Sequence, residues 1–195
     1  MKLLFGYLFL MIIIQRYSGL LVILFSFVGV VLVGLIYNYK EKSLISLSHL
    51  VTYKLPKVMF TAFTLLSGIS QIVFYIYLNK LLFKSAELGL VLLLISTIYL
   101  ILLSLNPVNK RKLIHYTLGF AYYYLTGTGS IILGIDLIRK YPIYGIISIC
   151  LPLIMVSLYI IKLRKYKALI AELTHMGMCY MWITLFYISV LPHLN

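Results

Sequence analysis

Charged residues are scarce in this chain of 195 residues, and acidic residues are much scarcer than basic ones. Only 11% of the residues are charged, 63% are hydrophobic, and just four are acidic. A water-soluble domain carries roughly 25% charged residues, so this composition cannot cover a soluble surface. The scarcity of charge excludes a soluble globular domain and predicts a protein that is embedded in a membrane.

Cysteine is also sparse, and the spacings used by common metal sites are missing. Cys150 and Cys179 both fall inside apolar stretches, which argues against a disulfide framework or a cysteine-rich zinc site. The four histidines have neither HxxxH nor HExxH spacing. We therefore expect no metal and no cofactor, and the sequence assigns no catalytic residue.

Long apolar stretches are what the chain has in abundance. Each is close to the ~20 residues that a helix needs to cross a hydrocarbon core of ~30 Å. Backbone groups in lipid must be paired within the protein, so each stretch should be a helix. The sequence predicts an all-α polytopic transmembrane helix bundle, that is, a multi-pass integral membrane protein of one domain. Its six core spans are 18–38, 57–79, 87–105, 113–138, 142–161 and 172–191.

The basic residues, which give a net charge of +13, lie mostly on every second connection between these stretches. Connections 39–57, 106–112 and 162–171 are the basic ones, and the positive-inside rule makes their side cytoplasmic. Charges beside membrane spans meet anionic lipid headgroups. We expect membrane lipids as partners at this basic face, other membrane subunits as further partners, and no nucleic acid.

This orientation requires the N-terminal segment to enter the membrane. If residue 39 is cytoplasmic, residue 18 lies outside, so the segment before it must cross, enter and return, or be cleaved. Residues 3–14 would form a helix of ~18 Å, too short to cross the hydrocarbon core unaided. We favour a short tilted helix over 3–16, which gives a seventh span; the alternative is six spans with residues 1–16 in the interface.

Two of the predicted spans carry polar side chains on one face. Gln71 lies near the middle of span 57–79, and span 113–138 carries Tyr122 and Thr126 with His115 and Asp136 at its two ends. Lipid exposure of polar groups is costly, so both faces should turn inward. They either pack on neighbouring helices through hydroxyls and small residues, or line a polar cavity. Glycines at 119, 127, 129 and 134 predict close helix contacts in the second of these spans.

Four side chains that could carry protons or bind a phosphate-bearing lipid fall on the basic side of the membrane. Glu172 and His175 form an i, i+3 pair on one helical face. The parity of the connections places His49, His115, Glu172 and His175 on the same side. They are either ordinary interfacial residues or a functional cluster.

Several segments resemble a six-helix membrane group in their order and spacing. The segments are Ile45-Ser46-Leu47-Ser48-His49-Leu50, Lys54 to Phe60 with Pro56, Leu66-Ser67-Gly68, and Asn106-Pro107 followed by His115 and Gly119-Phe120-Ala121. The group includes uncharacterised prokaryotic proteins, and the damage-regulated autophagy modulator (DRAM) and FGF-receptor-activating protein families are similar to it. The resemblance implies a six-helix core without an established enzymatic activity.

These patterns predict a non-enzymatic multi-pass membrane protein that binds or passes a small or lipidic ligand. The ligand would use a polar seam between spans 57–79 and 113–138. One alternative is a structural or accessory subunit of a larger membrane complex. A second alternative is a lipid-modifying membrane enzyme that uses the histidines of the basic side.

Overall fold

The computed structural model describes residues 13–29, 54–82, 87–106, 111–162 and 167–193. These residues form helices only, which confirms the predicted all-α class for the part of the chain described. In order, the helices are Ile13–Gly29, α2 (Lys54–Leu82), α3 (Glu87–Leu105), α4 (Lys112–Leu137), α5 (Pro142–Lys162) and α6 (Lys167–Ser189), followed by the short 3-10 helix η2 (Leu191–His193).

Three of the helices are long and apolar enough to cross a membrane. They cover Lys57–Leu82, Glu87–Leu105 and Lys112–Leu137, whereas Ile13–Gly29 and Pro142–Ser157 are shorter apolar helices. The outer surface is apolar as well, since large side chains such as Phe120 and Leu113 are 74% and 80% exposed. Polar side chains such as Gln71, Thr97 and His175, by contrast, are buried among the helices. An apolar exterior with polar side chains turned inward is the arrangement that lipid favours.

The N-terminal helix differs from the prediction of separate segments at 3–16 and 18–38. Residues 13–29 form one continuous helix, so no turn separates the two segments at Tyr17. Nothing between Gln15 and Gly19 stops a helix, because Gln and Arg are good helix formers and no proline intervenes. The rest of both segments, including residues 1–12 and 30–38, lies outside the described residues.

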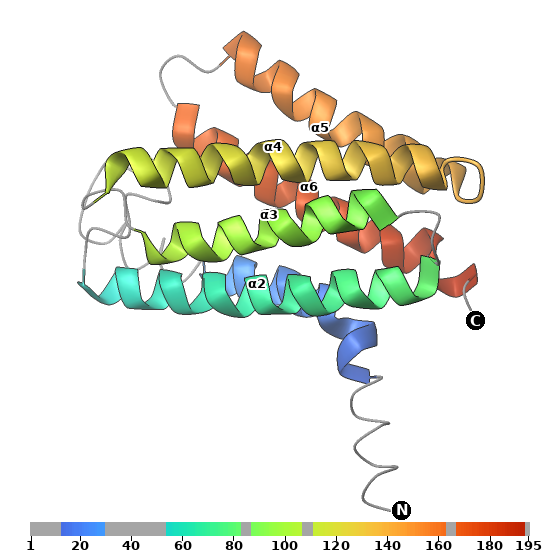
Figure 1. The fold of residues 1–195 in the computed structure, drawn as a ribbon, viewed down its shortest axis with the longest axis horizontal. Coiled ribbons are helices and arrows are strands. Elements are labelled where there is room, and N and C mark those ends of the chain that lie inside the picture. The colour runs from blue at the N-terminus through green and yellow to red at the C-terminus, as the bar shows by residue number, and fades with distance from the viewer. Residues whose placement is uncertain (1–12, 30–53, 83–86, 107–110, 163–166, 194–195) are drawn as a thin grey trace, which may run out of the picture.

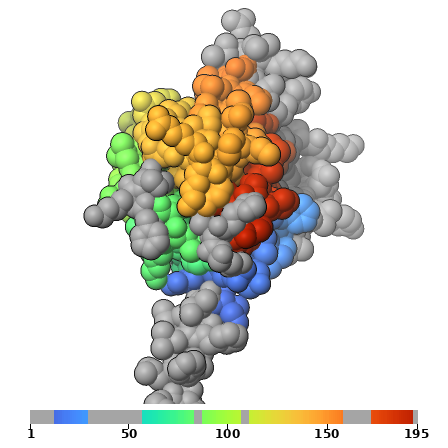
Figure 2. All heavy atoms as spheres, turned by 90° about the vertical axis from the view of Figure 1, so that its right-hand side faces the viewer, coloured from blue at the N-terminus to red at the C-terminus, as the bar shows by residue number. Residues whose placement is uncertain are grey.

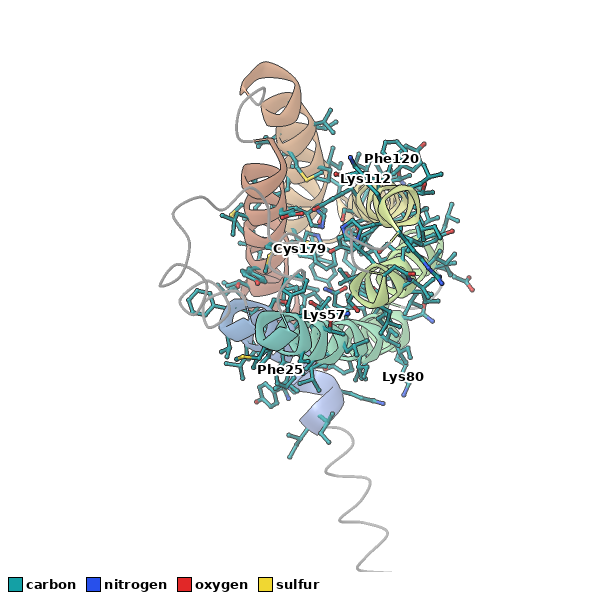
Figure 3. All side chains as sticks on the ribbon, turned by 90° about the vertical axis from the view of Figure 1, so that its left-hand side faces the viewer. Phe25, Lys57, Lys80, Lys112, Phe120 and Cys179 are labelled. Carbon is teal, nitrogen blue, oxygen red and sulfur yellow. The ribbon has the colours of Figure 1, made fainter. Side chains whose placement is uncertain are left out.

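The helices form a ring around a common axis (Figure 3). Successive helices run in opposite directions (Figure 1), with α3 packed on both α2 and α4, α5 packed on α4, and α6 packed on α5. The N-terminal helix closes the ring: Ser26 bonds to Ser67 of α2 at 2.7 Å, and Tyr187 of α6 donates to the Arg16 carbonyl at 2.6 Å. Figure 2 looks onto the end of the ring where α2 and α6 end.

The ring order separates the two helices that carry the predicted polar stripes. The sequence predicts a seam between 57–79 and 113–138, but α3 lies between α2 and α4. The reason is a close backbone approach, since a Cβ atom on Gly89 of α3 would lie 2.7 Å from the Leu133 nitrogen of α4. The polar faces of α2 and α4 therefore meet across the interior of the ring instead of along a shared interface.

Candidate functional site

A cavity of about 40 Å³ lies inside the ring. Side chains from α2, α3, α4, α5 and α6 line it, and the apolar part of its wall includes Leu93, Leu151 and Ile183. The polar part consists mainly of Gln71, Thr126, Ser130, Ser148, His175 and Trp182. Thr126 and Pro152 lie near the middle of their helices, so the cavity lies about halfway along the ring.

Three of the side chains singled out from the sequence meet at this cavity. Gln71 comes from α2, Thr126 from α4 and His175 from α6, and all three are buried. A fourth, Tyr122, is buried on α4 and contacts His175. Figure 3 shows the same division between inside and outside: Cys179, which also lines the cavity, lies on the inner side of the ring, whereas Phe120 and Lys80 point away from it.

The other predicted site residues lie elsewhere. His115 is buried beside the start of α4, where its Nδ1 donates to the Asn106 carbonyl oxygen at 2.7 Å. Asp136 is exposed near the end of α4, and Glu172 is half-buried on α6 outside the cavity wall. His49 falls outside the described residues. Among the residues that the structure describes, no group of three or more His, Cys, Asp or Glu side chains could hold a metal.

His175 is held by contacts on both ring nitrogens. Nε2 lies 3.0 Å from the Tyr122 hydroxyl and Nδ1 lies 3.2 Å from the Met155 sulfur. A thioether sulfur carries no proton, so Nδ1 is the donor to Met155 and Nε2 accepts from Tyr122. The rings of Tyr122 and Tyr123 stand edge-on to the imidazole, at centroid distances of 5.0 and 4.6 Å. The imidazole is thus fixed in orientation and tautomer.

The Cys179 thiol also approaches this imidazole, and the pair is the nearest approach to a nucleophile beside a base. Its sulfur lies 3.6 Å from Nε2 of His175. The hydroxyl of Tyr122 lies closer to the same nitrogen, and Nδ1 faces a thioether instead of a carboxylate or carbonyl that would orient a base. The arrangement therefore lacks the third group of a catalytic triad.

Three further hydrogen bonds involve polar groups at the cavity wall. Thr97 of α3 donates to the side-chain oxygen of Gln71 at 3.1 Å. Between α6 and α5, the indole nitrogen of Trp182 donates to the Ser148 hydroxyl at 2.7 Å, and that hydroxyl donates to the Tyr144 carbonyl at 2.7 Å. The sequence pattern did not single out Thr97, Ser148 or Trp182. Trp182 is the only tryptophan of the chain, and this was the one feature of the sequence that could have singled it out.

Thr126 differs from its neighbours because its hydroxyl has no partner among the described residues. The side chain is 7% exposed, and its Oγ1 is buried without a hydrogen bond. An unpaired hydroxyl in an apolar setting costs roughly 1–3 kcal/mol. A polar group placed this way beside a cavity would gain a hydrogen bond from a ligand that reaches it.

The wall that the described residues form is therefore uncharged. Hydroxyls, an amide, an indole, an imidazole and a thiol surround the cavity, and no Lys, Arg, Asp or Glu side chain among the described residues contributes to it. Such a wall can donate and accept hydrogen bonds without selecting a charge.

Comparison of the chain with protein-family models, curated proteins and solved structures gave no match. The resemblance to the six-helix group stays a prediction that rests on the sequence segments quoted above.

Proposed function

We propose that this protein is a non-enzymatic multi-pass membrane protein whose helix ring binds or passes a small neutral polar solute. The observation that carries the proposal is the cavity at which Gln71, Thr126 and His175 meet from three different helices. Polar side chains that face inward from separate apolar helices are typical of pathways and binding sites in membrane proteins.

The crossing of the membrane by all six helices belongs to the same proposal. Three helices have the length and apolarity that a crossing needs, and the antiparallel order brings α5, α6 and the N-terminal helix alongside them. In this arrangement Arg111 and Lys112 lie at the end of the ring that the sequence predicts to be cytoplasmic. Anionic lipid headgroups would be their partners.

The size of the cavity supports a small solute over a lipidic one. Pockets for drug-sized ligands enclose roughly 300–1,000 Å³, whereas this cavity encloses about 40 Å³. An acyl chain would require the helices to move apart, but a molecule of a few heavy atoms would need only side-chain adjustments. The uncharged wall further favours a neutral solute over an ion, because burying an unpaired charge is costly.

The test is solute permeation in proteoliposomes. Stopped-flow light scattering would follow osmotic swelling with urea and glycerol, in vesicles that contain the wild-type protein or Thr126→Leu. We expect permeability above that of protein-free vesicles for the wild type. We also expect its loss in Thr126→Leu, because the longer side chain fills the cavity.

Thr117→Leu provides the matched control, since Thr117 lies on the exposed face of the same helix. If the wild type adds no permeability to either solute, or if both variants behave alike, solute passage is wrong. A wild type that adds no permeability but purifies in a defined ratio with another membrane protein would support the accessory-subunit alternative instead.

A further inference from the structure

We infer that the cavity holds buried water, anchored by the Thr126 hydroxyl of α4 and by the Ser148 carbonyl of α5, which Pro152 leaves without a helical N–H donor. The inference concerns the same cavity as the proposed function, but it holds whether or not a solute passes through the protein. The inferred ligand is water, a neutral molecule that both donates and accepts hydrogen bonds, and its site is the part of the cavity between α4 and α5.

The first argument is the behaviour of the hydroxyls on these helices. Hydroxyls within helices commonly donate to a carbonyl one turn earlier, and the bonds in this protein range from 2.6 to 2.9 Å for Ser70, Thr97, Ser148, Ser157 and Ser189. Thr126 makes no such bond, although it is buried and lies mid-helix. Its hydroxyl therefore lacks the usual internal partner at the place where it lines the cavity.

The second argument comes from α5, the helix that packs on α4 beside the cavity. Pro152 lies inside this helix and has no N–H, so the carbonyl of Ser148 lacks its usual helical donor. Ser148 and Pro152 both line the cavity. Ordered water is one of the recognised partners of a backbone carbonyl that an internal proline leaves unpaired in an apolar helix.

The two positions lie at the same level of the ring. A Cβ atom on Gly127, the residue after Thr126, would lie 3.7 Å from the Pro152 side chain. A molecule in the cavity can therefore contact the Thr126 side of α4 and the turn of α5 that contains Pro152 together. Gln71 and Ser130, which line the same cavity, supply further hydrogen-bonding groups.

The volume of the cavity limits which ligands fit inside it. A buried water needs at least about 10–15 Å³ of this kind of space and two to four polar partners, whereas a cavity that binds benzene encloses about 150 Å³. The cavity of about 40 Å³ lies between these limits and has the polar partners. It suits a small number of water molecules and excludes an organic ring.

Trp182 gives a direct test, because the only tryptophan of the chain lines this cavity and is bonded to Ser148. Its emission maximum, and the ratio of its intensities in D2O and H2O, would be measured in detergent for the wild type, Thr126→Val and Thr126→Ser. Valine keeps the shape of threonine and removes the hydroxyl, whereas serine keeps the hydroxyl.

With water in the cavity, we expect a D2O enhancement in the wild type that is retained in Thr126→Ser. In Thr126→Val we expect a blue-shifted emission and a reduced enhancement. Thr117→Val, on the exposed face of α4, should match the wild type. An emission that is already blue, insensitive to D2O and equal in all four proteins would overturn the inference. The fluorescence measurement does not depend on solute permeation. A negative result here would overturn the inference about water and leave the proposed function to its own test.

Discussion

The Nε2 atom of His175 on α6 lies 3.0 Å from the phenol oxygen of Tyr122 on α4. Among the described helices, α4 and α6 do not pack backbone against backbone, because α5 contacts both of them instead. The two side chains therefore bridge the interior of the ring just beside the cavity, and they keep two of its walls at a fixed separation.

Removal of the phenol hydroxyl should weaken this bridge. We expect Tyr122→Phe to lower the free energy of unfolding by about 1 kcal/mol, the usual contribution of one such hydrogen bond. The measurement is reversible denaturation in mixed micelles. Tyr124→Phe is the control, since Tyr124 is 64% exposed on the same helix. Equal losses in the two variants would show that the bridge contributes nothing to stability.

Ser148 and Ser157 allow a matched comparison on α5. Both hydroxyls donate to the carbonyl four residues earlier, but only Ser148 also accepts the indole N–H of Trp182. Ser148→Ala leaves that buried donor unpaired, so we expect a loss of about 1–3 kcal/mol. Ser157→Ala should change the free energy of unfolding much less. A double-mutant cycle with Trp182→Phe checks the assignment, which fails if the two substitutions are additive.

Gly89 and Gly177 should respond to alanine in opposite directions. A Cβ atom on Gly89 would lie 2.7 Å from the Leu133 nitrogen and 2.9 Å from the Gly129 carbonyl, both of which are backbone atoms that cannot yield alone. Gly89→Ala should therefore force α3 away from α4 and lower the thermal midpoint in detergent.

At Gly177 a Cβ atom would meet no atom of the described residues within 4 Å. Gly177→Ala should raise stability by up to about 1 kcal/mol, because alanine favours the helix and restricts the unfolded chain. If both variants shift the midpoint downward by the same amount, the close approach of α3 and α4 is not what distinguishes the two sites.

Tyr187 should control the protection of the N-terminal helix. Its hydroxyl donates to the Arg16 carbonyl at 2.6 Å and accepts from the Gly19 amide at 3.2 Å. We expect Tyr187→Phe to raise trypsin cleavage after Arg16 about 5-fold, the factor that corresponds to about 1 kcal/mol of local opening. Tyr116→Phe, on an exposed part of α4, should cleave at the wild-type rate, and no difference between the two would contradict the contact.

Much of the helical layout follows from the sequence because apolar length is so direct a signal. The predicted span 87–105 coincides with α3, and span 113–138 differs from α4 by a single residue at each end. Span 172–191 is less accurate, since α6 begins at Lys167. Basic residues in the preceding segment suggested a connection, but lysine and arginine are good helix formers and extend the first turns of a helix at little cost.

The inward direction of Gln71 and Thr126 was also open to sequence reasoning, since polar groups turn away from lipid. His175 was expected on the basic side of the membrane, together with His115, and lies at the cavity instead. The order of the helices around the ring was not open to sequence reasoning. A polar stripe gives the direction in which a face points but does not identify the helix opposite it. The placement of α3 depends on the fit of Gly89 against α4, and the Thr97 bond to Gln71 depends on that placement.

His115 shows why a shared stripe does not make a shared site. It lies on the same helix as Tyr122 and Thr126, but about 10 Å from Tyr122 along the axis. There its Nδ1 donates a hydrogen bond to the backbone carbonyl of Asn106 at the end of α3. The sequence shows that the three residues share one helical face. The hydrogen-bond partner of His115 depends instead on where the chain places the Asn106 carbonyl after α3.

The contact between Tyr187 and the N-terminal helix has a consequence for biosynthesis. A ribosome delivers Arg16 and Gly19 first, and the side chain that holds them follows 168 residues after Gly19. Until α6 emerges, the aromatic face of α2 around Phe74 lacks Trp182 and Phe186, the rings that later cover it. We expect the growing chain to remain an open arc in the bilayer, and chains truncated before α6 to be substrates for membrane quality control.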